Sequence, residues 1–148
     1  MNRINMTDNL QNAKQILHNE GYTCVLCNSN EIIYSTVRGV APLLGWLESG
    51  KDFSSFCAAD KVIGKAAAML YVLLNIKEIY TDVISKGAIQ TFEKYGVKYY
   101  FNHMTDMILN RTQSGYCPME EATQSTNEPQ LALLAIQAKL RQLKEGLK

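Results

Sequence analysis

The segment from residue 61 to residue 74 is the most apolar part of the chain. Its spacing predicts a helix over Lys61–Leu74, capped by Asp60, with almost no polar side chain after the first turn. A helix that is apolar around its whole circumference must be covered on more than one side. The apolar run Ala66–Leu74 is too short to cross a bilayer, because a transmembrane helix needs about 20 residues. We therefore expect the chain to fold around this helix without contacting a membrane.

The rest of the chain alternates between helix and strand signals. The predicted elements, in order, are a helix ending at Gly21, strands at Tyr22–Cys27 and Glu31–Val37, a short helix at Leu43–Glu48, the apolar helix, a strand at Ile76–Ile84, a helix from Ser85 to Gly96, a strand at Val97–Phe101, a short helix at Pro118–Ala122 and a final helix from Pro129. Turn residues at 28–30 predict that the first two strands form an antiparallel hairpin. A hairpin followed by strand–helix–strand units predicts an α/β fold, with helices on both faces of a mixed sheet in three layers, α-β-α.

Composition restricts the chain to a few classes of protein. Its 148 residues, 47% hydrophobic and 20% charged, are typical of a globular domain. We expect one domain over residues 1–128, with residues 129–148 as a helix packed on it or on a second subunit. A formal net charge of +1 gives no electrostatic footprint for nucleic acid, so none is expected as a partner. The first residues lack the apolar core of a signal peptide, and four cysteines are too few for a disulfide scaffold, which favours the cytoplasm.

Two stretches of the sequence carry a family resemblance. Residues 59–68 read Ala-Asp-Lys-Val-Ile-Gly-Lys-Ala-Ala-Ala, and further on stand Asn110-Arg111-Thr112 and Cys117-Pro118-Met119-Glu120. With these stretches the chain resembles a small prokaryotic family of unknown function that shares the cytidine-deaminase-like fold. The resemblance covers about residues 7–125, most of a domain. It implies the cytidine-deaminase-like form of the α/β fold and brings no settled function.

Zinc deaminases with this fold use a fixed set of metal ligands. They need His or Cys two residues before a Glu at one helix start, and Pro-Cys-x-x-Cys at the start of the next helix. Here the first position reads Ala58-Ala59-Asp60, with alanine in place of the ligand, and the second, Ser85–Ala88, has no cysteine. We therefore expect no catalytic zinc and no other cofactor. A deaminase-like fold does not by itself imply deaminase activity.

Lys61 and Lys65 are expected one turn apart at the start of the apolar helix. The helix dipole makes that end positive, so each cation there costs roughly 0.3–1 kcal/mol. Together with Gly64 and outward-pointing backbone N–H groups, they predict a site for a small anionic molecule, nucleotide-like or phosphorylated. Asn110 and Arg111 are expected to line the same cleft. The alternative is a simple capped helix whose two lysines are solvated or form surface salt bridges.

Cys117 is the candidate nucleophile. Pro118 suits the first position of a short helix, which makes Cys117 its N-cap, where the pKa of a thiol is lowered. This predicts a reactive thiol, with Asp60 or Lys65 carrying the proton. The alternative is a small buried residue, since no histidine can be assigned to it as a base. Cys24-x-x-Cys27 lies within a strand, where residues three apart point to opposite faces, so both are expected to be structural.

The sequence is compatible with three functions. The chain is a binding protein for a small anion, a cysteine-dependent enzyme using Cys117, or a non-catalytic partner protein in an oligomer. The final helix favours assembly, because its apolar residues recur every three or four positions as a narrow seam: Leu133, Ile136, Leu140, Leu143 and Leu147. Leaving such leucines in water costs about 1.5–3 kcal/mol each. A homodimer through the end of this helix is predicted, with packing on its own domain as the alternative.

Overall fold

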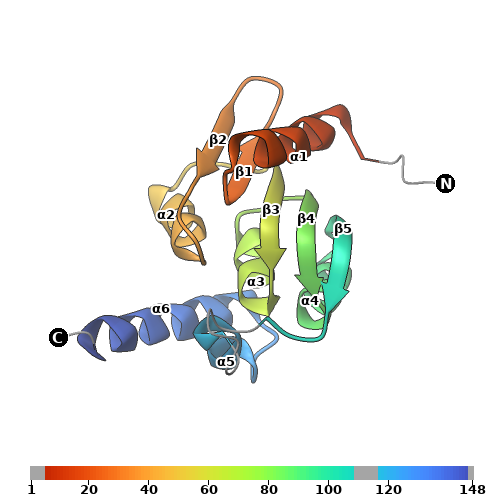
Figure 1. Cartoon of the computed structure of the whole chain (residues 1–148). Coiled ribbons are helices and arrows are strands. Elements are labelled where there is room, and N and C mark those ends of the chain that lie inside the picture. Colours follow the sequence, from red (N-terminus) through yellow and green to blue (C-terminus); the bar gives the residue numbers. More distant parts are fainter. Residues whose placement is uncertain (1–5, 109–116, 147–148) are drawn as a thin grey trace.

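The described strands form one mixed sheet with the order β2-β1-β3-β4-β5 (Figure 1). The computed structural model describes residues 6–108 and 117–146. The strands are β1 (Cys24–Cys27), β2 (Ile32–Ser35), β3 (Cys57–Ile63), β4 (Glu78–Ser85) and β5 (Lys98–Thr105). β1 is antiparallel to both β2 and β3, whereas β3, β4 and β5 run parallel to one another. The predicted hairpin and the predicted mixed sheet are both confirmed.

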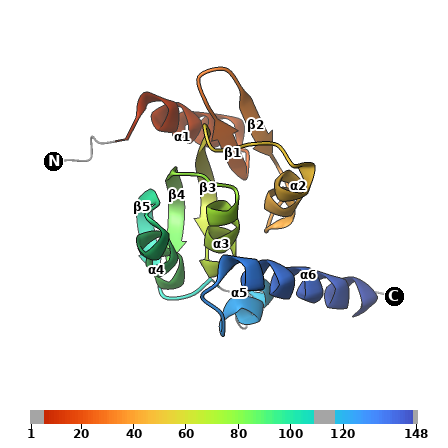
Figure 2. The ribbon, with the colours of Figure 1, turned by 180° about the vertical axis from the view of Figure 1, so that it is seen from behind.

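Helices lie on both faces of this sheet (Figures 1 and 2). α1 (Asp8–Glu20) lies across β1, β3 and β4 on one face. On the other face lie α2 (Ala41–Ser49), α3 (Lys65–Leu73) and α4 (Lys86–Tyr95). α5 (Pro118–Thr123) and α6 (Pro129–Gly146) pack against α3 near the end of the sheet where β3 finishes. The α/β class with helices on both sides is therefore as predicted.

Local capping signals explain where several helices begin and end. The hydroxyl of Thr7 accepts a hydrogen bond from the N–H of Leu10, and the hydroxyl of Ser85 accepts one from Ala88. Gly21 and Gly96 follow α1 and α4 with φ of 71°, the left-handed conformation that glycine adopts without steric cost. The end of α1 at Gly21 and both ends of α4 agree with the sequence prediction, because each depends only on neighbouring residues.

The central strand β3 was not predicted from the sequence. Asp60 and Lys61 were predicted as the cap and first turn of the apolar helix, yet both lie in β3, and the helix begins only at Lys65. The segment Cys57–Ile63 contains alanines and charged residues without an alternating pattern, so local propensity does not indicate a strand. The segment forms a strand because it lies between β1 and β4, where tertiary contacts override its weak local propensity.

The apolar helix is enclosed as predicted. All six residues from Ala66 to Tyr71 are buried in α3. They contact the sheet, and α4 and α6 pack against the same helix. None of the helices among the described residues is long and apolar enough to cross a membrane.

α6 is only partly covered by the rest of the molecule. Ala132 and Ile136 are fully buried, and α6 contacts α3 and α5. The second half of the helix extends beyond the body of the molecule (Figure 1), and Leu143 is exposed there. Leu147 lies outside the described residues. The homodimer predicted through this end of α6 stays a prediction.

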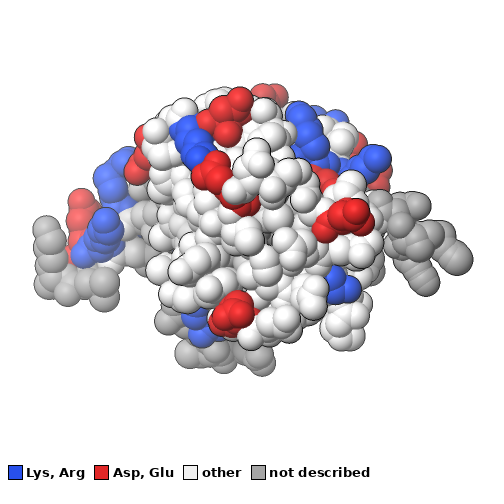
Figure 3. Space-filling model, turned by 90° about the horizontal axis from the view of Figure 1, so that it is seen from above, with Lys and Arg blue, Asp and Glu red and all other residues white. Residues whose placement is uncertain are grey.

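Surface charge is mixed on the end of the molecule that carries α1 and the β1–β2 hairpin. Lysine, arginine and acidic side chains are interspersed there, with wide uncharged areas between them (Figure 3). In the part of this face that the structure describes, no continuous region of one sign is present (Figure 3). Its electrostatics thus favour neither a polyanion nor a polycation.

The attachment of α1 can be tested by removing one core side chain. Leu17 is fully buried between α1 and the sheet, so Leu17→Ala should lower the free energy of unfolding by about 2–5 kcal/mol. Gln15→Ala, on the exposed side of the same helix, is the matched control and should change stability little. Denaturant unfolding followed by circular dichroism measures both. Equal effects would mean that α1 contributes little to the core.

Candidate functional site

A carboxylate from α5 occupies the start of α3. Glu120 is only 5% exposed, and its two oxygens accept hydrogen bonds from successive backbone N–H groups. Oε1 accepts from Lys65 and Oε2 from Ala66, each at 3.0 Å. These N–H groups belong to the first turn of a helix, which has no internal partners for them. The site predicted for an external anion therefore holds an anion supplied by the chain itself.

Gly64 makes room for this carboxylate. Its backbone is extended, with φ of −97° and ψ of −174°, so conformation does not require glycine. The reason is space, since a Cβ atom at this position would lie 2.6 Å from the carboxylate carbon and from both oxygens of Glu120. Gly87, at the start of α4, is close in the same way, because its Cβ would lie 3.2 Å from Cβ of Lys65. Two glycines thus allow Lys65 and Glu120 to approach their neighbours closely.

Lys65 also binds α5 through its side chain. Its Nζ donates to the backbone carbonyl of Gln124, the C-cap residue of α5, at 3.3 Å. Burial lowers the pKa of Lys65 below its usual value, while the charge of Glu120 opposes that shift. The backbone of Lys65 therefore holds one part of α5 and its ammonium group holds another.

The other predicted ligand-binding residues are placed less favourably. Lys61 is exposed in β3, and its N–H donates to the carbonyl of Thr23, so Lys61 and Lys65 do not share a helix turn. The predicted pair of cations at one helix end is therefore wrong. Asn110 and Arg111 lie outside the described residues.

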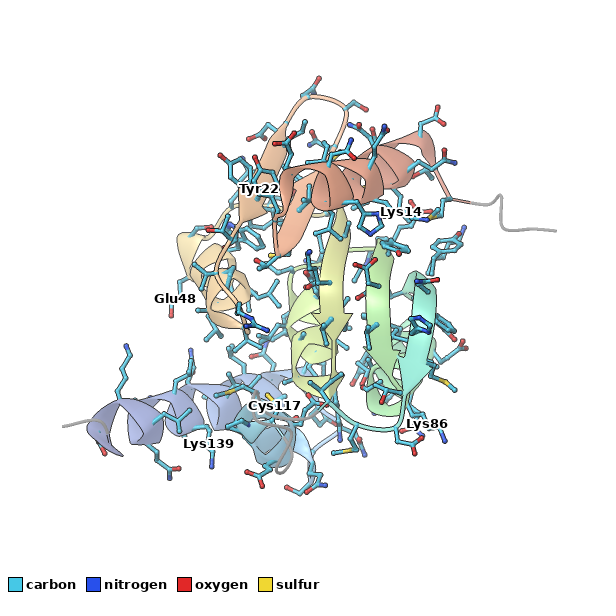
Figure 4. All side chains as sticks on the ribbon, in the orientation of Figure 1. Lys14, Tyr22, Glu48, Lys86, Cys117 and Lys139 are labelled. Atoms are coloured by element: carbon cyan, nitrogen blue, oxygen red, sulfur yellow. The ribbon has the colours of Figure 1, made fainter. Side chains whose placement is uncertain are left out.

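Cys117 is the N-cap of α5, as predicted, but its thiol makes no capping hydrogen bond. It is half-buried and packs against the main hydrophobic core (Figure 4). Because Glu120 follows one turn later and contacts α3, the structure brings Cys117 to the same region as Lys65. No described hydrogen bond joins the thiol to Asp60 or Lys65, and its catalytic role stays a prediction.

Asp60 belongs to a second polar cluster, between β3 and α3. Its carboxylate accepts a hydrogen bond from the hydroxyl of Tyr71 at 2.6 Å and one from the N–H of Val62 at 3.3 Å. Burial raises the pKa of Asp60 to about 6, although these hydrogen bonds oppose the shift. Burial also raises the pKa of Tyr71 well above its usual value, and the charge of Asp60 adds to that shift. The cluster thus contains a carboxyl group that loses its proton at a higher pH than an exposed aspartate does.

Cys24 lies opposite Asp60 in the pairing of β1 with β3. Burial raises the pKa of Cys24, and the nearby charge of Asp60 raises it further, so the thiol stays protonated. Cys27 contacts α1 instead, where its Sγ donates to the carbonyl of Asn9. The side chains of Cys24 and Cys27 therefore lie on different faces of the sheet, as predicted.

The metal-ligand positions also need correction. Ala58-Ala59-Asp60 was compared with a zinc motif at a helix start, but these residues lie in β3. In the structure the helix that directly follows the β1–β2 hairpin is α2, whose start reads Val40-Ala41-Pro42, and the next helix, α3, starts with Gly64-Lys65-Ala66. No group of three or more His, Cys, Asp or Glu side chains suited to a metal ion occurs in the described ranges.

Sequence reasoning missed Glu120 and Gln124. Glu120 stood within a motif that carried the family resemblance, but nothing distinguished it from the adjacent Glu121. Its partner lies 55 residues earlier, and a single sequence holds no signal for a hydrogen bond over that separation. Gly64 directly precedes α3 and cannot cap it, but the predicted helix began at Lys61 with Asp60 as its cap, so the sequence prediction did not leave the N–H groups of Lys65 and Ala66 unpaired.

The importance of this cap can be measured by truncation. Glu120→Ala removes two charge-assisted hydrogen bonds and leaves two buried N–H groups unpaired, so it should lower the free energy of unfolding by about 1–3 kcal/mol. Glu121→Ala is the matched control, because Glu121 is exposed on the same short helix. Denaturant titration of both variants provides the comparison. Similar stabilities would show that the cap is energetically unimportant.

Asp60 should make stability depend on pH. Its folded pKa of about 6 exceeds the value of about 3.9 for an exposed aspartate, so the folded state binds the proton more tightly. This contribution to stability is present below about pH 4 and is lost as the pH rises to about 6. An asparagine side chain does not titrate, so the free energy of unfolding of Asp60→Asn should change less between about pH 4 and pH 6 than that of the wild type. Between these two pH values the wild type should therefore lose more stability than the variant. Denaturant unfolding across pH tests this, and Asp106→Asn, a surface control, should keep the wild-type slope.

Comparison with known proteins identifies the family. A family model described as a domain of unknown function, DUF1893 (TM1506), matches residues 12–140. The solved structure of a DUF1893 family protein, TM1506 from Thermotoga maritima, is similar with a TM-score of 0.82 at 21% identity, over 93% of this chain and 91% of that chain. Among curated proteins, none matches. The structural likeness indicates the same fold, the family model spans most of the sequence, and the chain belongs to the DUF1893 family.

Proposed function

We propose that the protein has a cytidine-deaminase-like fold and binds a small anionic molecule, nucleotide-like or phosphorylated, at the start of α3. The observation that carries this proposal is the carboxylate of Glu120, which bridges the N–H groups of Lys65 and Ala66 at 3.0 Å each. A group with two anionic oxygens therefore fits this position. In the free protein Glu120 occupies it, and the ligand binds in exchange for Glu120.

The chemistry of the position favours phosphate as well as carboxylate. Backbone N–H groups in the first turn of a helix point outward, and the helix dipole adds positive potential there. The ammonium group of Lys65 is close by, since it reaches the carbonyl of Gln124 on the same short helix as Glu120. Gly64 leaves the space that the anion needs, because a Cβ there would lie 2.6 Å from the bound oxygens.

The arrangement of the strands supports the deaminase-like part of the proposal. An antiparallel hairpin precedes three parallel strands, and β1 lies between β2 and β3. The α3 start follows the carboxyl end of β3, the edge of an α/β sheet where ligands generally bind. The contributions of Lys61, Asn110 and Arg111 to the ligand site remain part of this proposal.

Exchange with Glu120 sets the expected affinity. The internal carboxylate is tethered to the site, so an external anion binds only to the fraction of molecules in which Glu120 has left. The apparent dissociation constant is the intrinsic one divided by that fraction. A stable cap thus makes the wild type a weak binder, and removal of the carboxylate strengthens binding.

The proposal can be tested with inorganic phosphate and a nucleoside monophosphate at matched ionic strength. Either ligand should raise the melting temperature of Glu120→Ala more than that of the wild type, because a ligand of the native state stabilises it by mass action. Glu121→Ala should respond like the wild type. In the double variant Gly64→Ala/Glu120→Ala the new Cβ fills the anion position, and the response to phosphate should be lost.

Two results would contradict the proposal. If phosphate and the nucleotide leave the melting temperature of Glu120→Ala unchanged, the position does not accept an external anion. If Gly64→Ala/Glu120→Ala responds as strongly as Glu120→Ala, the anion binds elsewhere. Calorimetric titration of the same four proteins distinguishes weak binding from none.

A further inference from the structure

β5 has an edge with little of the usual protection against pairing. It is the last strand of the sheet among the described residues. Exposed edge strands are commonly guarded by charged side chains, proline or bulges. Lys98, at the start of β5, is its one charged residue, because residues 99–105, Tyr-Tyr-Phe-Asn-His-Met-Thr, contain no Lys, Arg, Asp, Glu or Pro. Phe101 is 42% exposed and Met104 is 52% exposed on this strand.

The backbone of β5 offers hydrogen-bonding groups to this edge. Lys98 is paired with Glu78, and its N–H donates to the carbonyl of Lys77, so the polar backbone groups of Lys98 face β4. Backbone direction alternates along a strand, which turns the N–H and C=O groups of Tyr99 and Phe101 away from β4. In an antiparallel arrangement a residue with outward groups exchanges two closely spaced hydrogen bonds with the residue opposite it, so Tyr99 and Phe101 can each form one such pair with a partner strand.

Hollows flank the same part of β5 on both faces. A shallow, open hollow of about 520 Å³ lies on the α4 side and includes Phe92 and Glu93, and an open hollow of about 360 Å³ on the α1 side includes Lys14 and Tyr80. Tyr99 and Tyr100 line both hollows. Side chains of an added strand point alternately to the two faces of the sheet, so such a strand would cover both hollows.

The segment is complementary to itself in an antiparallel arrangement centred on Tyr100. Each Tyr99 then stands opposite Phe101 of the other copy, and Lys98 stands opposite Asn102, so no like charges face each other. The rings of Tyr99 and Phe101 already stack within one chain, 6.3 Å apart and 15° from parallel. Aromatic pairs across neighbouring strands contribute about 0.2–1 kcal/mol each. This self-complementarity selects a second copy as the partner.

We propose that the protein forms a twofold dimer in which β5 pairs with β5 of a second copy around Tyr100, so that the two sheets become one. A symmetric dimer of this kind uses the same surface on both subunits. The proposal is independent of the anion site at α3 and places the interface elsewhere than the end of α6.

Variants on three surfaces identify the interface. Light scattering and sedimentation velocity should show a dimer for the full wild-type chain at micromolar concentration. Phe101→Lys should shift it to monomer, because a charge on the edge opposes pairing. Met104→Lys, equally exposed but outside the paired segment Lys98–Asn102, is the matched control and should remain dimeric. Leu143→Lys on α6 should also remain dimeric, and circular dichroism verifies that each variant is folded.

A cross-link tests the register. In the proposed dimer the two copies of residue 100 are directly opposite in a non-hydrogen-bonded pair, with Cα atoms about 4.5 Å apart, within the range of a disulfide. Tyr100→Cys, made in a Cys117→Ser background, should form a covalent dimer on mild oxidation. Asn102→Cys in the same background should not, because residue 102 stands opposite residue 98.

Three outcomes would overturn the proposal. A monomeric wild type at high micromolar concentration excludes the dimer. Loss of the dimer in Leu143→Lys but not in Phe101→Lys places the interface on α6. Equal cross-linking of Tyr100→Cys and Asn102→Cys excludes pairing centred on Tyr100.

Discussion

The hydrogen bonds between Glu120 and the start of α3 join the C-terminal helices α5 and α6 to the rest of the structure. Residues 8–105 build the sheet and its main helices, whereas α5 and α6 come later in the chain and cover α3. Glu120 supplies the polar part of that contact by pairing the N–H groups of Lys65 and Ala66. α3 needs this cap because Gly64 has no side chain to cap it. The absence of a side chain at Gly64 also gives Glu120 its access, so both features follow from one residue.

Local signals made much of the fold predictable. Ser85, Gly21 and Gly96 act on backbone groups a few residues away, and the end of α1 and both ends of α4 were predicted accordingly. β3 was missed because its strand conformation depends on β1 and β4 on either side rather than on its own sequence. That one error moved the predicted start of the apolar helix from Lys65 to Lys61. The same error explains why the residues compared with the zinc motif, Ala58-Ala59-Asp60, lie in a strand and not at a helix start.

The sequence indicated which segments of the candidate site lie near each other, but it gave no role to Glu120. Lys65, Gly64 and Cys117 were assigned to one region, and contact between α3 and α5 brings their segments together. Glu120 was not assigned a role, because hydrogen bonds over 54 and 55 residues of sequence arise from tertiary packing. Asp60 was assigned to the same site, yet its hydrogen bonds join it to Tyr71 and Val62 within a separate cluster.

The direction of the parallel strands keeps the proposed anion site and the proposed dimer interface apart. α3 begins after β3 ends, so Lys65 and Glu120 lie beyond the carboxyl ends of the strands. The self-complementary segment Lys98–Asn102 is the first part of β5, which runs parallel to β3 by way of β4, and so it lies toward the opposite end of the sheet. α6, at the carboxyl end, does not reach that segment (Figure 1). Pairing through β5 would therefore leave the start of α3 accessible, and each subunit of a dimer would keep its own anion position.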